Sequence, residues 1–139
     1  MKPRMFILTL ILAGMIAGMS SCSKESKDSN AIEILSITPS SPADMPFGEY
    51  VLIRYDYQIG NPEGALMWIQ PYTDGGITPN YLYSSSKTYT GTGFREVGIS
   101  VKDGDQPVLV DQLKIIMKTP DKEKTLYESF MDVNFTFSK

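Results

Sequence analysis

Reactive side chains are scarce in this chain of 139 residues, which contains one cysteine, Cys22, and no histidine. Imidazole is therefore absent as a general base, a metal ligand or a pH-sensitive group. Any thiol chemistry would depend on Cys22, and no disulfide can form within the chain. Only oxygen ligands remain for a metal, so a bound ion would be a hard cation such as Ca²⁺.

Cys22 follows an N-terminal segment with the layout of a secretory signal. Lys2 and Arg4 precede an apolar run over residues 5–19, and two serines lie directly before the cysteine. A helix of that length reaches about 22 Å, which is shorter than the hydrocarbon core of ~30 Å. We therefore expect residues 1–21 to be a removed signal peptide rather than a membrane-spanning helix.

This segment resembles the signal of bacterial lipoproteins, with small residues at Ser20 and Ser21 and Met19 where leucine is usual. The resemblance implies cleavage before Cys22 and a covalent lipid, including palmitate-type acyl chains, on that cysteine. Each buried methylene contributes about 0.8 kcal/mol, so two or three chains hold a protein on a membrane permanently. No other cofactor is expected.

Residues 22–30 are expected to form the acylated cysteine and a flexible tether, because residues 23–30 contain no apolar side chain except Cys22's neighbours in charge and size. Ser23 stands where the inner-membrane retention signal has Asp. Lys24-Glu25 partly resembles the surface-export signal of Bacteroidetes lipoproteins. These resemblances imply a location in the cell envelope, anchored to the outer membrane and facing the cell surface.

The overall charge bears on the partners that the chain can bind. The net charge is −3, and removal of Lys2 and Arg4 with the signal would make it −5. No basic stripe occurs in the sequence, so we expect no nucleic-acid partner.

Strand periodicity dominates residues 31–139, which are expected to form one domain. Apolar and polar side chains alternate with period two in 51–59, 97–101, 112–118 and 131–138. Residues 65–72 are apolar on both faces, which predicts a central strand with Trp68 in the core. The phase slips within residues 32–37, which predicts a bulge. Residues 81–89 predict a weaker, aromatic edge strand.

Turn-forming residues separate these segments at 39–42, 60–64, 74–76, 103–105 and 119–122. About seven short strands with such turns predict an all-β fold of two packed sheets. The order of features resembles a bacterial immunoglobulin-like or fibronectin III-like module, from the opening at Ile34–Ser40, through Tyr55 and Trp68, to the turn before Phe94. The resemblance implies an immunoglobulin-like sandwich over residues 31–138, and a fold alone implies no activity.

A tyrosine-rich stretch over residues 72–89 is the best candidate for a ligand or partner surface. Aromatic rings stack on sugar faces or fill protein hot spots, and nearby Asn and Ser side chains can bind hydroxyl groups. The candidate residues are Tyr72, Asn80, Tyr81, Tyr83 and Tyr89. The alternative interpretation is that these tyrosines serve packing only.

Two further motifs have the residue types for chemistry but favour a structural interpretation. Asp103 and Asp105 could form half of a Ca²⁺ site, but Asp-Gly-Asp is also an ordinary turn sequence, so no metal is expected. Ser84–Lys87 contains a serine and a lysine, the types needed for a Ser-Lys nucleophile. That stretch is polar, so its lysine should be solvated and no catalytic residue is expected.

The sequence therefore predicts a non-catalytic, membrane-anchored envelope lipoprotein that acts as a binding or interaction module. One form of this hypothesis is an accessory subunit of a surface uptake or adhesion assembly, with an envelope protein as partner. The alternative is direct carbohydrate binding by the tyrosine-rich loop. A hydrolase inhibitor or an enzyme is a third hypothesis that no residue pattern favours.

Overall fold

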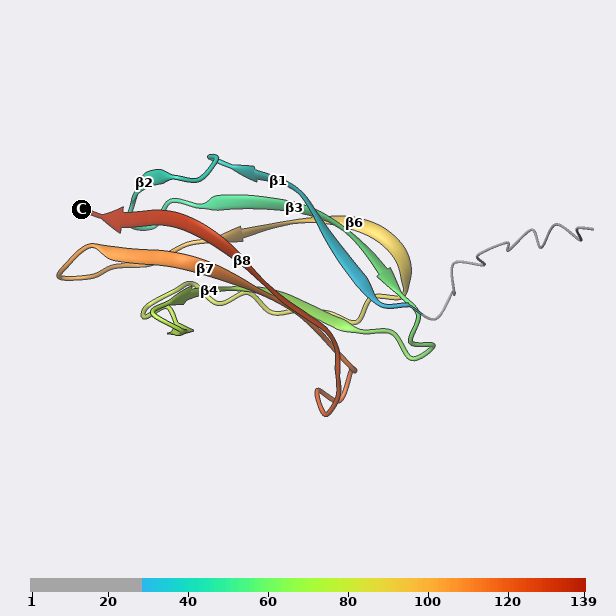
Figure 1. Ribbon diagram of the computed structural model, residues 1–139. Helices are drawn as coiled ribbons and strands as arrows, with labels where there is room; N and C mark the ends of the chain where they lie inside the picture. The colour runs from blue at the N-terminus through green and yellow to red at the C-terminus, as the bar shows by residue number, and fades with distance from the viewer. Residues whose placement is uncertain (1–28) are drawn as a thin grey trace, which may run out of the picture.

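The computed structural model describes residues 29–139, and this part of the chain is built from strands without a helix (Figure 1). In chain order the strands are β1 (Ala31–Thr38), β2 (Ala43–Pro46), β3 (Val51–Ile59), β4 (Leu66–Thr73), β5 (Gly76–Ile77), β6 (Gly91–Ile99), β7 (Val108–Lys118) and β8 (Thr125–Ser138). The predicted all-β class is confirmed.

The strands form two sheets that lie one over the other (Figure 1). A three-stranded sheet has the order β1-β3-β6, and a five-stranded sheet has the order β2-β8-β7-β4-β5. Neighbouring strands are antiparallel except β2 and β8, which are parallel. The structure contains one strand more than the predicted seven, because β2 and β5 are too short to produce a period-two pattern in the sequence.

The predicted edge strand at residues 81–89 is wrong. This segment makes only two isolated bridges, Tyr81 with Val101 and Tyr89 with Ala65. Val101 follows a strand of the three-stranded sheet, whereas Ala65 precedes a strand of the five-stranded sheet. The segment therefore passes from one sheet to the other along their open side, and it cannot sustain a ladder with either.

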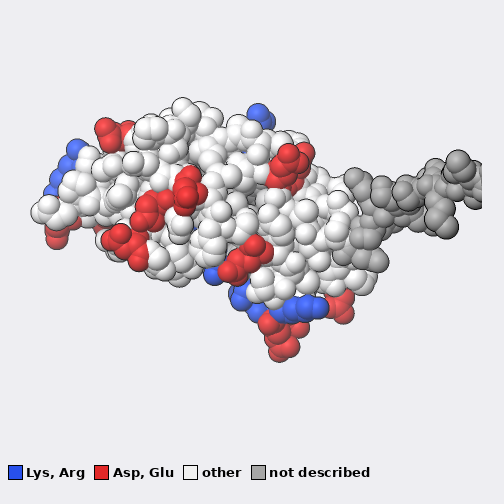
Figure 2. Space-filling view, viewed as in Figure 1, with Lys and Arg blue, Asp and Glu red and all other residues white. Residues whose placement is uncertain are grey.

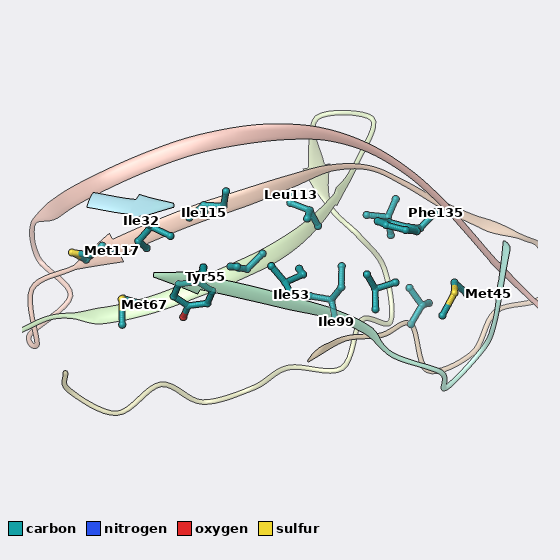
Figure 3. Close-up of a cluster of buried hydrophobic side chains, with 14 of the residues drawn as sticks. Ile32, Met45, Ile53, Tyr55, Met67, Ile99, Leu113, Ile115, Met117 and Phe135 are labelled. Atoms are coloured by element: carbon teal, nitrogen blue, oxygen red, sulfur yellow. The ribbon is translucent and has the colours of Figure 1, made fainter. Parts of the chain in front are cut away.

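The hydrophobic core lies between the two sheets (Figure 3). Alternate residues of β3, namely Val51, Ile53 and Tyr55, have no exposed surface, and Phe135 and Phe137 of β8 are equally buried. Full burial of a large apolar side chain contributes about 1.5–3 kcal/mol. Because the chain has a single cysteine and no internal disulfide, this core supplies most of the stability.

The phase slip predicted in the first strand is confirmed as a bulge. Ile34 pairs with Tyr55 and Ser36 pairs with Arg54, so Leu35 has no partner in β3. The extra residue turns Leu35 outward, where 53% of it is exposed.

The expected signal peptide and the lipidation site Cys22 lie outside the described residues. Asn30, the last residue of the expected tether, accepts a hydrogen bond on Oδ1 from the Gly60 N–H at 3.0 Å. This contact joins the start of the described chain to the β3–β4 loop, at the end of the molecule opposite the C-terminus (Figure 1). No helix within residues 29–139 has the length and apolar character needed to cross a bilayer.

Two phenylalanines of β8 provide a matched test of the core. Replacing the buried Phe135 with alanine should lower the free energy of unfolding by about 3–5 kcal/mol, because it removes a large apolar group and leaves a cavity. Phe130→Ala should cost about 1 kcal/mol or less, since 49% of Phe130 is exposed. Urea unfolding followed by circular dichroism measures both, and equal losses would contradict this packing.

Candidate binding site on the five-stranded sheet

Trp68 lies on the outer face of the five-stranded sheet, so the prediction that it belongs to the core is wrong. Its neighbours Met67 and Ile69 are the β4 residues that join the core between the sheets. Trp68 is instead half-buried and lies opposite Ile116 of β7, which is buried on the same outer face. An apolar run on both faces of a strand does not reveal which face meets the other sheet.

Trp68 lines a depression of about 350 Å³, which we call the outer-face groove. Its residues come from β4, β5 and β7, from the segment after β5 and from the β7–β8 hairpin. They are Trp68, Gln70, Tyr72, Ile77, Tyr83, Lys114, Ile116, Lys118 and Lys122. The groove thus combines three aromatic rings with three lysines, and no carboxylate lines it.

Strand register builds the floor of the groove. Gln70 pairs with Lys114 and Trp68 pairs with Ile116, and paired residues of antiparallel strands point to the same face. Period-two alternation then adds Tyr72 from β4 and Lys118 from β7 on that face. Side chains that are scattered over fifty residues of sequence therefore converge on one surface.

Two flanking segments raise the sides of the groove. Tyr83, of which 64% is exposed, belongs to the segment that passes between the sheets. Lys122 belongs to the hairpin between β7 and β8, which projects away from the three-stranded sheet (Figure 1). Its Nζ lies 5.9 Å from the centroid of the Trp68 ring.

Hydrogen bonds hold the hairpin that carries Lys122. The Lys122 N–H donates to the Thr119 carbonyl at 2.8 Å, and the Thr119 N–H donates to the Lys124 carbonyl at 2.9 Å. Asp121 accepts from the Thr119 hydroxyl and from the Glu123 N–H. These bonds, with that of Thr119 the strongest, hold the pKa of Asp121 below its usual value.

Lys114 is held among aromatic rings at the far side of the groove. Tyr72 and Phe130 meet edge to face with their centroids 5.7 Å apart. The Lys114 Nζ lies 5.8 Å from the Tyr72 centroid and 5.6 Å from the Phe130 centroid. Glu128 pairs with the same amine at 3.6 Å. Tyr72 is thereby kept in a defined orientation beside the groove.

The structure divides the predicted tyrosine-rich surface into two parts. Tyr72 and Tyr83 line the groove, and the Tyr81 ring lies beside Tyr83 with the centroids 6.3 Å apart. Partial burial is the main cause that raises the pKa of Tyr81 above its usual value.

Tyr89 and Asn80 lie away from the groove lining. Tyr89 packs edge to face against Tyr57 at 5.7 Å, and the Arg95 guanidinium lies 4.4 Å from its ring centroid. Asn80 has a left-handed backbone with φ of 54°, and its side-chain amide donates to the Asp103 carbonyl at 3.4 Å. Both residues therefore have structural roles.

The other two motifs are placed in loops. Asp103 and Asp105 are exposed between β6 and β7, and residues 29–139 contain no group of three or more His, Cys, Asp or Glu side chains arranged for a metal. Ser86 Oγ accepts from the Met67 N–H at 3.1 Å and donates to the Lys87 carbonyl at 3.0 Å. Ser86 thus completes the backbone hydrogen bonding of β4.

Sequence reasoning missed the contribution of Trp68 and of the three lysines to the site. A signal was present, because Lys114 and Lys118 occupy the polar phase of their strand together with the apolar Ile116. An apolar residue on a polar face marks a place where that face is covered or binds something. No family model, no curated protein and no solved structure matches this chain, so the geometry of the groove is the basis for its functional interpretation.

The role of Ser86 can be tested against its neighbour Ser84. Ser86→Ala should lower the free energy of unfolding by about 1–2 kcal/mol, because it leaves the Met67 N–H without an acceptor. Ser84 is exposed, so Ser84→Ala should change that free energy by less than about 0.5 kcal/mol. Denaturant titration of both variants is the measurement, and indistinguishable stabilities would refute a structural role for Ser86.

Proposed function

We propose that this chain is a non-catalytic binding module of a bacterial cell envelope, anchored by lipid on Cys22, and that the outer-face groove is its ligand site. The observation that supports this best is the convergence of Trp68, Tyr72 and Tyr83 with three lysines in one depression of about 350 Å³. Small-molecule sites typically have volumes of about 300–1,000 Å³. Aromatic rings in such a surface supply contact area at a low cost in conformational entropy.

The chemistry of the lining favours binding over catalysis. The groove presents indole, phenol, amide and ammonium groups, with no carboxylate among its lining residues. A general acid–base pair or a serine nucleophile with its base would need groups that this lining does not combine. The same groups suit recognition, since they offer stacking, hydrogen bonds and positive charge.

The strand order supports the immunoglobulin-like assignment that the sequence pattern suggested. In that fold one sheet contains strands A, B and E, and the other contains C, F and G. β1, β3 and β6 take the first three positions, and β4, β7 and β8 take the others. The segment at residues 81–89 replaces the remaining edge strand of the first sheet.

The placement of the two chain ends is compatible with an anchored module. The described chain begins at one end of the sandwich, and the C-terminus lies at the opposite end (Figure 1). The groove lies on a broad face rather than at the end where the chain enters. A lipid at Cys22 would therefore leave the groove accessible.

An envelope protein is a second candidate partner, favoured by the outer face of the three-stranded sheet. Leu52 and Phe94 are 41% and 66% exposed there, and the Tyr50 ring covers Gly98 beside them. This apolar surface lies on the opposite side of the sandwich from the groove. A subunit contact and a ligand could therefore be held at the same time.

The anchor has a direct test. Expressed in a bacterium that makes lipoproteins, the native chain should incorporate labelled palmitate and sediment with membranes. Cys22→Ala should abolish the label and release the protein from the membrane fraction, because its acylation site is gone. Membrane association of the unlabelled variant at the native level would refute the lipid anchor.

The two broad faces can be separated with one variant of each. In calorimetry against a panel of oligosaccharides, Trp68→Ala should weaken binding at least about tenfold, because a central aromatic contact contributes about 2 kcal/mol or more. Phe94→Ala should leave glycan affinity unchanged.

The same two variants decide between a glycan and a protein partner. Affinity capture from solubilised membranes that fails for Phe94→Ala, but not for Trp68→Ala, would assign a protein partner to the three-stranded sheet. If neither variant alters binding in either assay, the proposed sites are wrong. Unfolding curves establish that both variants remain folded.

A further inference from the structure

The charge of the outer-face groove is opposite to that of the protein. The chain has a net charge of −3, and Figure 2 shows carboxylates spread over the face it displays, with Lys and Arg mainly at its ends and lower rim. The groove nevertheless has three lysines and no acidic residue in its lining. A cationic depression on an acidic protein attracts anions locally and is not explained by overall composition.

Two of the three groove lysines lack an acidic partner. Lys114 pairs with Glu128 at 3.6 Å, whereas Lys118 and Lys122 form no ion pair within the described part of the chain. Their ammonium groups therefore remain free to meet an anionic group on a ligand. Lys118 extends from the strand that forms the floor, and Lys122 extends from the hairpin at the side, so the two charges approach the groove from different elements.

Trp68 supplies a further unmet interaction. Its Nε1 is buried and has no hydrogen-bond partner among residues 29–139. An unpaired buried donor costs about 1–3 kcal/mol, which an acceptor oxygen would recover. The Lys122 side chain beside the Trp68 ring is flexible and exposed, so it can move as a ligand enters.

We propose that the ligand of the groove is an acidic carbohydrate, in which sugar rings carry carboxylate or sulfate groups. This inference rests on the proposed function of the groove. Sugar rings match Trp68 and Tyr72 through their apolar faces, and their hydroxyl groups match the amide of Gln70. The anionic substituents match Lys118 and Lys122. A neutral glycan would use only the first part of this surface.

The single tryptophan makes the groove observable. Because Trp68 is the only tryptophan of the chain, its fluorescence in the acylated full-length protein reports directly on occupancy. The probes are oligogalacturonate, which is carboxylated, and sulfated dextran oligomers, with neutral galactan and dextran oligomers as their counterparts. At least one acidic probe should bind about tenfold or more tightly than its neutral counterpart. Its affinity should fall as NaCl increases from about 50 to about 500 mM, because exposed charges are screened.

Matched lysine variants identify the charges responsible. The double variant Lys118→Gln/Lys122→Gln should lower the affinity for the acidic probe by about tenfold or more and leave neutral-probe affinity unchanged. Lys124→Gln removes a positive charge from the same hairpin but outside the groove lining, so it should change affinity less than about twofold. Which acidic probe binds distinguishes carboxylate from sulfate recognition.

Three outcomes would overturn the inference. Equal, Trp68-dependent binding of acidic and neutral oligosaccharides would remove the charge preference and leave the groove as a glycan site. Equal binding of polyglutamate and the acidic sugars would assign the groove to acidic peptides. If no probe alters Trp68 fluorescence, and Trp68→Ala alters neither glycan binding nor membrane-protein capture, the proposed function of the groove fails as well.

Discussion

Antiparallel pairing of β4 with β7 is the contact on which both the core and the candidate site depend. It places Met67 opposite Met117 on the inner face and Trp68 opposite Ile116 on the outer face. The two faces are inseparable, because a shift of one residue would exchange every side chain between them. The buried methionines support this register from within, and the groove is its consequence on the outside.

The segment between β5 and β6 shows how the fold manages its open side. Thr78 is almost completely buried and its N–H donates to the Pro71 carbonyl at 3.0 Å, while the Leu82 N–H donates to Ser100 at 2.8 Å. With Ser86 bound to the Met67 N–H, this irregular segment satisfies backbone groups on both sheets. It also raises Tyr83 beside the groove, so the closure of the sandwich and the shape of the site share one stretch of chain.

Burial and exposure divide the tyrosines of this protein into two classes. Tyr55 has no exposed surface, and burial is the main cause that raises its pKa, although Arg95 donates to its hydroxyl at 3.2 Å. Tyr89 lies between that arginine and Tyr57 and extends the same packed cluster. Tyr72 and Tyr83 instead border an open depression of about 350 Å³, where a ligand can reach them. Position, not residue type, separates a packing tyrosine from a recognition tyrosine.

Local patterns in the sequence determined the all-β class, the limits of β3 and the bulge in β1, because period-two alternation depends only on adjacent residues and one wet face. The sequence alone also suggested Tyr72 and Tyr83 as site residues. The tertiary structure decided that Trp68 faces outward and that Tyr89 and Asn80 are structural. It also decided that lysines from β7 and its hairpin join Trp68, a result of strand pairing between distant segments. Where both faces of a strand are apolar, only the partner sheet determines which one is the core.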